Sequence, residues 1–341
     1  MTSATTGTTQ VIEDKPFNEK GKDTQNVLRN LQDVQSIERV HLQRLTEATK
    51  KRPALRTAVV HPTDETSLKG VIAAAEQGLI VPILIGPEHK VRAVAESANV
   101  NLEPYEIITT EHSHAAATKA VAMARAGEVQ ALMKGSLHTD ELMHAVVDKE
   151  QGLLTDRRIS HVFAFDVPTY AKPLFITDAA INVYPTLTQK RDIVQNAIDL
   201  AHALSIELPK VAILSAVETI NPIIQSTLDA AALCKMADRG QLTGAIVDGP
   251  LAFDNAISSE AANIKGIKSP VAGQADILVV PDLEAGNMLA KQLEYLGDAQ
   301  AAGITLGARV PIILTSRADD TMTRLASCAL AVMMIDYQEK Q

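Results

Sequence analysis

Apolar and polar residues follow two alternating periods along most of the chain, and this pattern predicts strands that alternate with helices. Short apolar runs typical of buried strands occur at 57–60, 81–85, 105–108 and 131–133. Helical spacing follows the first, third and fourth of these runs, and Asp64 is the predicted cap of the first helix. Such alternation predicts βαβ units and a mainly parallel sheet.

The second half of the chain begins with an exception to this alternation. The apolar runs 161–167 and 174–177 are separated by too few residues for a helix, so they are predicted to pair antiparallel. Further strands are predicted at 211–215, 244–247, 277–280, 304–306 and 312–314. Further helices are predicted at 187–204, 223–239, 255–264, 284–295 and 321–335.

The N-terminal 50 residues differ from the rest. Residues 1–26 are polar and predict a mobile tail, and residues 27–45 carry apolar positions at helical spacing. The amphipathic segment predicts a helix that packs on its own domain or on a dimer partner. The organisation expected from the whole pattern is residues 1–50 as tail and helix, 51–158 with 305–341 as a first α/β domain, and 159–304 as a second.

Composition narrows the possible functions. The 341 residues carry a net charge of −9, which disfavours a nucleic-acid partner, and aromatic residues make up only 3% with no Trp. Cys234 and Cys328 are too far apart in the sequence to suggest a disulfide scaffold or a Cys-based metal site. No apolar stretch approaches the roughly 20 residues of a membrane span, and the N-terminus has no signal-peptide pattern. A cytoplasmic protein with no membrane partner is expected.

Polar clusters at the ends of predicted strands are the candidate chemistry, because ligands of open α/β sheets bind beyond the carboxyl ends of the strands. The four clusters are Lys134-Gly135-Ser136 with His138-Thr139, Thr177-Asp178, Asp248-Gly249-Pro250, and Ser316-Arg317. The first places a cation and a hydroxyl before a helix N-terminus, which favours an anion. It is equally compatible with an ordinary helix start, because acidic residues occupy the first turn.

Ser316-Arg317 follows a buried strand, where a guanidinium would suit a phosphate or a developing oxyanion; a surface Arg is the alternative. The scattered His residues form no metal-binding motif, so no catalytic metal is expected. No nucleotide-binding glycine motif and no nucleophile elbow occurs. From the residues alone, the chain is predicted to be a two-domain α/β enzyme that acts on a small phosphorylated or anionic metabolite.

Several blocks, in their order and spacing from residue 57 to the C-terminus, resemble the phosphate acetyltransferase and phosphate butyryltransferase family. They are Lys-Gly-Ser-Leu-His-Thr at 134–139, Ile-Ser-His-Val-Phe at 159–163, Thr-Asp-Ala-Ala-Ile-Asn at 177–182, Asp-Gly-Pro-Leu-Ala-Phe-Asp at 248–254, Ser-Pro-Val-Ala-Gly at 269–273, Pro-Asp-Leu-Glu-Ala-Gly-Asn at 281–287, and Ser316-Arg317.

This resemblance implies two three-layer α/β domains with mainly parallel sheets, similar to isocitrate and isopropylmalate dehydrogenases, with the active-site cleft between them. The implied reaction is acyl-CoA plus phosphate giving acyl phosphate plus CoA, in a homodimer, with acetyl the favoured acyl group and butyryl the alternative. Coenzyme A would be a co-substrate, and no bound cofactor is implied.

The resemblance also implies roles for individual residues. Ser316 and Arg317 would lie near the reacting phosphate and carbonyl. The family's base for the CoA thiol has no match at its own spacing, so Asp319, with Asp320 as its alternative, is the candidate base in this chain. The implied substrate-binding residues are Lys134, Gly135, Ser136, Thr139, Ser160, Thr177, Asp178 and Asn182. Transfer would be direct, without a covalent enzyme intermediate.

Two departures from the acetyl-type pattern keep other functions open. Met322 and Thr323 stand where acetyl-type members have the proposed base, and His144 and Ala145 stand where they have an Arg. A catalytically degenerate binding protein is therefore an alternative, as is an NAD-dependent dehydrogenase, because the same architecture hosts both chemistries.

Overall fold

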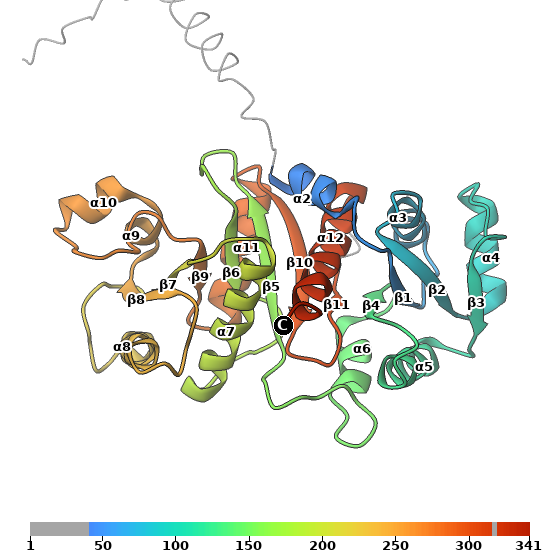
Figure 1. The fold of residues 1–341 in the computed structure, drawn as a ribbon, viewed down its shortest axis with the longest axis horizontal. Coiled ribbons are helices and arrows are strands. Elements are labelled where there is room, and N and C mark those ends of the chain that lie inside the picture. Colours follow the sequence, from blue (N-terminus) through green and yellow to red (C-terminus); the bar gives the residue numbers. More distant parts are fainter. Residues whose placement is uncertain (1–40, 316–318) are drawn as a thin grey trace, which may run out of the picture. The chain divides into compact units, whose positions relative to one another are not determined.

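The computed structural model describes residues 41–315 and 319–341, and the strands of these residues form one sheet (Figure 1). Its strand order is β3-β2-β1-β4-β11-β10-β5-β6-β9-β7-β8. The strands are β1 Leu55–Val60, β2 Ile80–Gly86, β3 Glu106–Thr109, β4 Ala131–Lys134, β5 Ser160–Asp166, β6 Leu174–Thr177, β7 Lys210–Leu214, β8 Ile246–Leu251, β9 Ile277–Val279, β10 Gln300–Leu306 and β11 Ile312–Ile313. This is the α/β fold with a mainly parallel sheet that the pattern predicts.

The helices of the described residues connect these strands. They are α2 His41–Thr49, α3 Glu65–Glu76, α4 Glu88–Ser97, α5 Ser113–Arg125, α6 Thr139–Val146, α7 Leu187–Ala203, α8 Gln225–Asp238, α9 Phe253–Ile257, α10 Ser259–Ile264, α11 Leu283–Tyr295 and α12 Thr321–Gln338. Local capping explains several starts, because the side chains of Asp64, Thr186, Asp282 and Asp320 each accept a backbone N–H of the first turn.

Two strands in the middle of the sheet break the parallel arrangement. Strand β10 pairs antiparallel with both β11 and β5, and β5 pairs antiparallel with β6. The predicted antiparallel pair 161–167 and 174–177 is therefore confirmed. All other pairings in the sheet are parallel.

Three sequence-based expectations differ from the structure. The strand predicted at 244–247 is β8, which continues through Gly249-Pro250 to Leu251, so this cluster is not a loop beyond a strand. A proline is tolerated there because β8 is an edge strand whose pairing with β7 shifts register. The helix predicted at 255–264 is two short helices separated at Ser258, and α4 was not predicted.

The apolar side chains separate into three clusters that reveal how the sheet is covered. One face carries a single cluster that joins α2, α3, α7, α8 and α12 to strands from both halves of the sheet. On the other face, α5 and α6 cover β1, β2 and β4 in a second cluster, while α9 and α11 cover β6, β7 and β9 in a third. The space between the second and third clusters lies over the central strands β5 and β10.

The N-terminal predictions fall mostly outside the described residues. Residues 1–40, which include the predicted tail and most of the predicted helix 27–45, are among those not described, and the described part begins with α2. Within residues 41–315 and 319–341, no helix is long and apolar enough to cross a membrane.

Candidate active site

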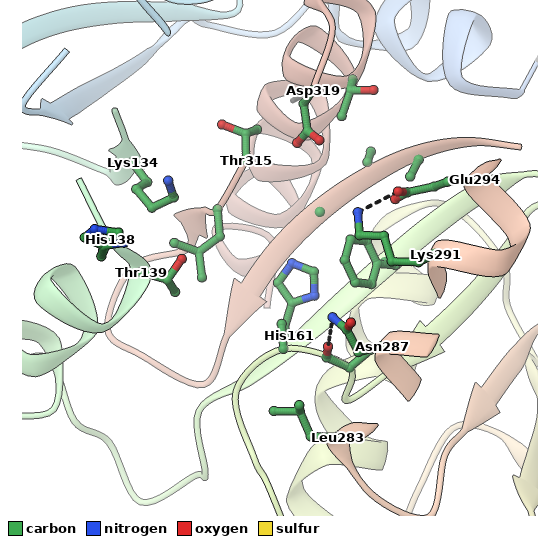
Figure 2. A pocket seen from close by; sticks show the side chains of 18 of the residues that line it. Lys134, His138, Thr139, His161, Leu283, Asn287, Lys291, Glu294, Thr315 and Asp319 are labelled. Atoms are coloured by element: carbon green, nitrogen blue, oxygen red, sulfur yellow. Dashed lines mark hydrogen bonds and ion pairs between the residues drawn. The ribbon is translucent and has the colours of Figure 1, made fainter. Parts of the chain in front are cut away.

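A cavity of about 440 Å³ lies over the central strands, between the two separate clusters of that face. Among the described residues, its lining comes from the end of β4 with the start of α6, from β5 and β10, from the turn after β6, and from the inner side of α11. Leu314, Thr315, Asp319 and Thr323 complete the described lining. Figure 2 shows Lys134, His138 and Thr139 on one side, Asn287, Lys291 and Glu294 on the other, and His161 between them.

Lys134 and Thr139 of the predicted anion-binding block line this cavity. Lys134 ends β4 and is only 6% exposed, and its Nζ donates to the carbonyl oxygens of Leu137 at 3.2 Å and Gly135 at 3.4 Å. Thr139 is the first residue of α6. A buried ammonium beside a helix N-terminus provides positive charge for an anion.

Glu141, in the acidic first turn of α6, forms hydrogen bonds with the helix cap and with a residue of α5. Glu141 accepts the backbone N–H of His138 at 3.3 Å and the hydroxyl of Ser113 at 2.5 Å. These hydrogen bonds lower the pKa of Glu141. Its charge therefore partly offsets the positive helix end, as the sequence suggested.

Gly135 and Ser136 lie outside the cavity lining and fix the turn after β4. A side chain at Gly135 would come within 2.5 Å of the carbonyl oxygen of Val60, so only glycine fits between β4 and β1. The backbone N–H of Ser136 donates to the carbonyl of His61 at 2.8 Å. Both residues thereby set the direction in which the chain reaches Thr139.

Ser160 and Thr177 are buried strand residues that do not line the cavity. The hydroxyl of Ser160 accepts the side-chain amide of Asn196 from α7, on the face of the sheet away from the cavity. Thr177 donates to the carbonyl of His161 at 2.8 Å. Because side chains alternate along a strand, it is His161, next to Ser160, that faces the cavity.

Asp178 and Asn182 form a buried network beside the cavity. The carboxylate of Asp178 accepts the backbone N–H groups of Ala180 and Ile181, both at 3.0 Å, and the side-chain amide of Asn182 at 2.6 Å. Burial raises the pKa of Asp178, while these donors oppose the rise. The network orders the turn after β6, and Ala179 and Ala180 of this turn line the cavity.

Only some of the predicted catalytic residues belong to the described part of the chain. Ser316 and Arg317 lie outside the described residues. Asp319 lines the cavity. Asp320 does not line it, and its Oδ1 accepts the backbone N–H of Thr323 at 2.8 Å as the cap of α12. Of the two candidate bases, Asp319 is therefore the one at the cavity.

Several cavity residues were not selected as site residues from the sequence: His161, Gly303, Asn287, Lys291 and Glu294. Lys291 and Glu294 form an ion pair at 2.6 Å, and Asn287 donates to the carbonyl of Ala179 at 3.3 Å. Two of them, His161 and Asn287, stand inside the blocks that carry the family resemblance. Gly303, Lys291 and Glu294 carry no such signal, because they reach the cavity only through the central place of β10 in the sheet and the packing of α11 on the same face.

Metal ligands are not grouped in the described part of the chain. Among residues 41–315 and 319–341, no three His, Cys, Asp or Glu side chains lie together in a way that would hold an ion. Of the described residues, Lys134, Lys291, Glu294 and Asp319 bring charged side chains to the cavity.

Comparisons with known proteins agree with the sequence resemblance. The phosphate acetyltransferase of Rhizobium meliloti is 63% identical over 290 residues, which cover 85% of this chain and 92% of the relative. The phosphate butyryltransferase of Clostridium acetobutylicum is 42% identical over 285 residues, covering 84% and 95%. A solved branched-chain phosphotransacylase from Enterococcus faecalis V583 superposes with a TM-score of 0.72 at 30% identity, covering 82% of this chain and 99% of that chain.

The family-level match covers the central and C-terminal parts of the chain. Residues 110–332 match the sequence profile described as phosphate acetyl/butaryl transferase. These residues include every segment that lines the cavity. The profile and the high identity to named relatives together show that the chain belongs to the phosphate acetyl/butaryl transferase family.

Proposed function

We propose that this protein transfers a short acyl group, with acetyl favoured, between coenzyme A and inorganic phosphate. The reaction is acyl-CoA plus phosphate giving acyl phosphate plus CoA, with CoA as co-substrate and no bound cofactor. The observation that carries this proposal is a cavity lined by Lys134 and Thr139 at one side and by small residues such as Ala179, Ala301 and Ala302 elsewhere, in a chain 63% identical to a phosphate acetyltransferase. A phosphate fits beside Lys134 and Thr139, and a short acyl group fits beside the alanines.

The proposed residue roles follow from position. Lys134 and Thr139 bind the phosphate, because the ammonium and the first turn of α6 offer donors to its oxygens. Ser316 and Arg317 contact the reacting phosphate and carbonyl, as the resemblance implies. Asp319 exchanges the proton of the CoA thiol, whose ordinary pKa of about 8.5, by analogy with Cys, leaves it mostly protonated at pH 7.

The remaining predicted binding residues act through the backbone that carries the contacting groups. Gly135 and Ser136 fix the turn that leads to Thr139, while Asp178 and Asn182 order the turn that carries Ala179. Ser160 and Thr177 hold β5 and β6 in place behind the cavity.

In the proposed mechanism, a phosphate oxygen attacks the thioester carbonyl carbon and forms the new C–O bond. The negative charge on the carbonyl oxygen is stabilised by Arg317 and nearby N–H groups. The C–S bond then breaks as the carbonyl re-forms, and the proton that the phosphate carried ends on the CoA sulfur by way of Asp319. No covalent enzyme intermediate is required.

The acyl group is the finer part of the proposal. The identity to the R. meliloti acetyltransferase is 63%, against 42% for the C. acetobutylicum butyryltransferase, which favours acetyl. The test is thiol release from acetyl-, propionyl- and butyryl-CoA by the purified full chain, with and without phosphate or arsenate. Release that requires phosphate or arsenate and is fastest with acetyl-CoA supports the proposal, and a chain that releases no CoA is instead a binding protein.

The assembly and domain arrangement are also proposed here. We propose a cytoplasmic homodimer in which each chain has two α/β domains, 51–158 with 305–341 and 159–304, that meet at the cavity. The three apolar clusters support this division on one face of the sheet, where α5 and α6 are separate from α9 and α11. Light scattering at micromolar concentration that gives a monomer mass would reject the dimer.

A further inference from the structure

His161 is the buried polar side chain at the centre of the cavity (Figure 2). His161 is only 1% exposed to solvent. Its ring packs edge-on against Phe163, the next cavity-facing residue of β5, with 4.4 Å between the ring centroids. Figure 2 shows the imidazole between the Lys134–Thr139 side and the side chains of α11. It therefore lies between Lys134 and the Lys291–Glu294 ion pair of α11.

The imidazole has no hydrogen-bond partner within the described part of the chain. Its Nδ1 is fully buried and unpartnered there, and no described residue bonds the other ring nitrogen. Thr305, directly opposite His161 in the pairing of β10 with β5, likewise has a buried hydroxyl without a partner among those residues. Buried polar groups are nearly always hydrogen-bonded in folded proteins. Because His161 lines the cavity, its unpartnered ring points to a ligand that the cavity would hold.

Gly303 creates the room that the imidazole occupies. A side chain at this position of β10 would come within 2.8 Å of Nε2 and 3.1 Å of Cε1 of His161. The glycine is held at this place because its N–H donates to the hydroxyl of Ser327 at 3.0 Å. Phe163 on one side and Gly303 on the other therefore set the orientation of the ring.

The imidazole is suited to an uncharged or developing oxygen. Burial lowers the pKa of His161 to about 3, so the ring is neutral at pH 7 and carries one N–H and one lone pair. A neutral donor adds little to the binding of a phosphate, which Lys134 serves better. A thioester carbonyl oxygen, which gains negative charge only in the transition state, is the fitting acceptor.

We propose that His161 is a substrate-contacting residue that donates a hydrogen bond from its neutral imidazole to the carbonyl oxygen of the acyl group. This inference rests on the proposed acyl transfer between CoA and phosphate. When the phosphate oxygen attacks the carbonyl carbon, the electron pair moves to the carbonyl oxygen, and the bond from His161 strengthens. The pair returns when the C–S bond breaks, and His161 keeps its proton throughout.

The binding test uses two non-reactive ligands that differ in the carbonyl alone: S-(2-oxopropyl)-CoA and S-propyl-CoA. Calorimetric titration of the full chain is done for wild type, His161→Phe, Gly303→Ala and the exposed control His89→Phe. His161→Phe keeps a ring in the cavity but removes the N–H. We expect it to weaken the oxo ligand by roughly tenfold, the worth of one neutral hydrogen bond, and to leave S-propyl-CoA within about twofold. Gly303→Ala, which displaces the ring, should act in the same direction, and His89→Phe should change neither ligand.

Kinetics provides the second readout. The loss of one donor to a developing oxyanion typically lowers kcat by about 10²-fold. His161→Phe should therefore lower kcat far more than it raises KM, and His161→Gln, which retains a neutral N–H donor, should recover part of the loss. If His161→Phe fails to fold, Gly303→Ala and His161→Gln test the same contact.

The results separate this inference from the proposed function. A wild-type chain that shows no phosphate-dependent CoA release overturns the proposed function itself. If wild type is active and His161→Phe keeps kcat within about threefold, or loses both CoA ligands equally, the contact with the carbonyl is wrong and the proposed transfer still holds.

Discussion

Arg324 of α12 donates a hydrogen bond from its Nη1 to the hydroxyl of Thr315 at 2.8 Å. Both residues are buried, and Thr315 directly precedes Ser316-Arg317. Burial lowers the pKa of Arg324, and the carboxylates of Asp319 and Asp64 oppose the effect. The arginine thus connects Thr315, just after β11 and just before the proposed catalytic residues Ser316 and Arg317, to the first turns of α12.

This connection predicts that Arg324→Met lowers both stability and activity. The substitution leaves a buried hydroxyl without its donor and removes a buried cation from beside two carboxylates, which costs about 3 kcal/mol in the free energy of unfolding. Urea unfolding measures the stability, and kcat reports on the neighbouring residues Ser316 and Arg317, for which a catalytic role is proposed. Arg324→Lys is the matched variant, and it should restore charge but not the hydrogen bond to Thr315 in full. Wild-type stability and kcat in Arg324→Met would contradict this role.

Arg317 is predicted to act in the transition state. Arg317→Ala should lower kcat by about 10²–10³-fold with a much smaller change in the KM for acyl-CoA, because the lost interaction is made mainly with developing charge. Arg317→Lys should recover only part of the rate, since an ammonium lacks the bidentate fork. A surface arginine would instead change kcat within about twofold and stability within about 0.5 kcal/mol. Steady-state kinetics and melting temperature for both variants decide between the two roles.

The two neighbouring aspartates are predicted to separate by function. Asp319 lines the cavity, so Asp319→Asn should lower kcat by at least about 10²-fold if it exchanges the thiol proton. Asp320→Asn should keep kcat within about threefold, because Asn remains a good N-cap for α12. Asp320→Ala should cost about 1 kcal/mol of stability with little effect on kcat. Equal kcat in Asp319→Asn and Asp320→Asn would remove Asp319 as the base.

His161 predicts an acid-sensitive component of stability. The imidazole pKa is about 3 in the folded state and 6.5 when unperturbed, so below pH 6.5 the unfolded chain binds a proton that the folded chain does not. The stabilisation is complete above pH 6.5 and is lost as the pH falls toward 3, by about 2 kcal/mol at pH 5 relative to pH 8. His161→Phe should lose less stability than wild type over this pH interval, measured by urea unfolding at pH 5 and pH 8. Identical losses in the two proteins would show that the ring is already protonated or exposed.

Metal removal is expected to leave the activity unchanged. Arg317 and Lys134 can neutralise the phosphate charge in the proposed mechanism without an ion. The measurement is phosphate-dependent CoA release after dialysis against EDTA, compared with a sample dialysed without it. Activity that disappears with EDTA and returns with one added metal would contradict the metal-free mechanism.

The alternation of strands and helices was readable from the sequence because it depends on local periodicity. The run 57–60, the cap at Asp64 and the helix 187–204 correspond closely to β1, α3 and α7. The family was readable for a similar reason, since its blocks stand at the ends of these elements. The prediction from local patterns was wrong where strand pairing extended an element. Strand β8 continues through Gly249-Pro250, because an edge strand tolerates a proline.

Which polar residues meet at the cavity was decided only by the tertiary structure. Ser160 and His161 are adjacent in the sequence, and the register of β5 against β10 determines that His161 faces the cavity while Ser160 contacts α7. Asp178 looks like a binding carboxylate in the sequence, but its oxygens accept the N–H groups of its own turn. The sequence determined the elements and the family, because both depend on neighbouring residues. The neutral state of His161 depends on burial by distant strands, which no local pattern encodes.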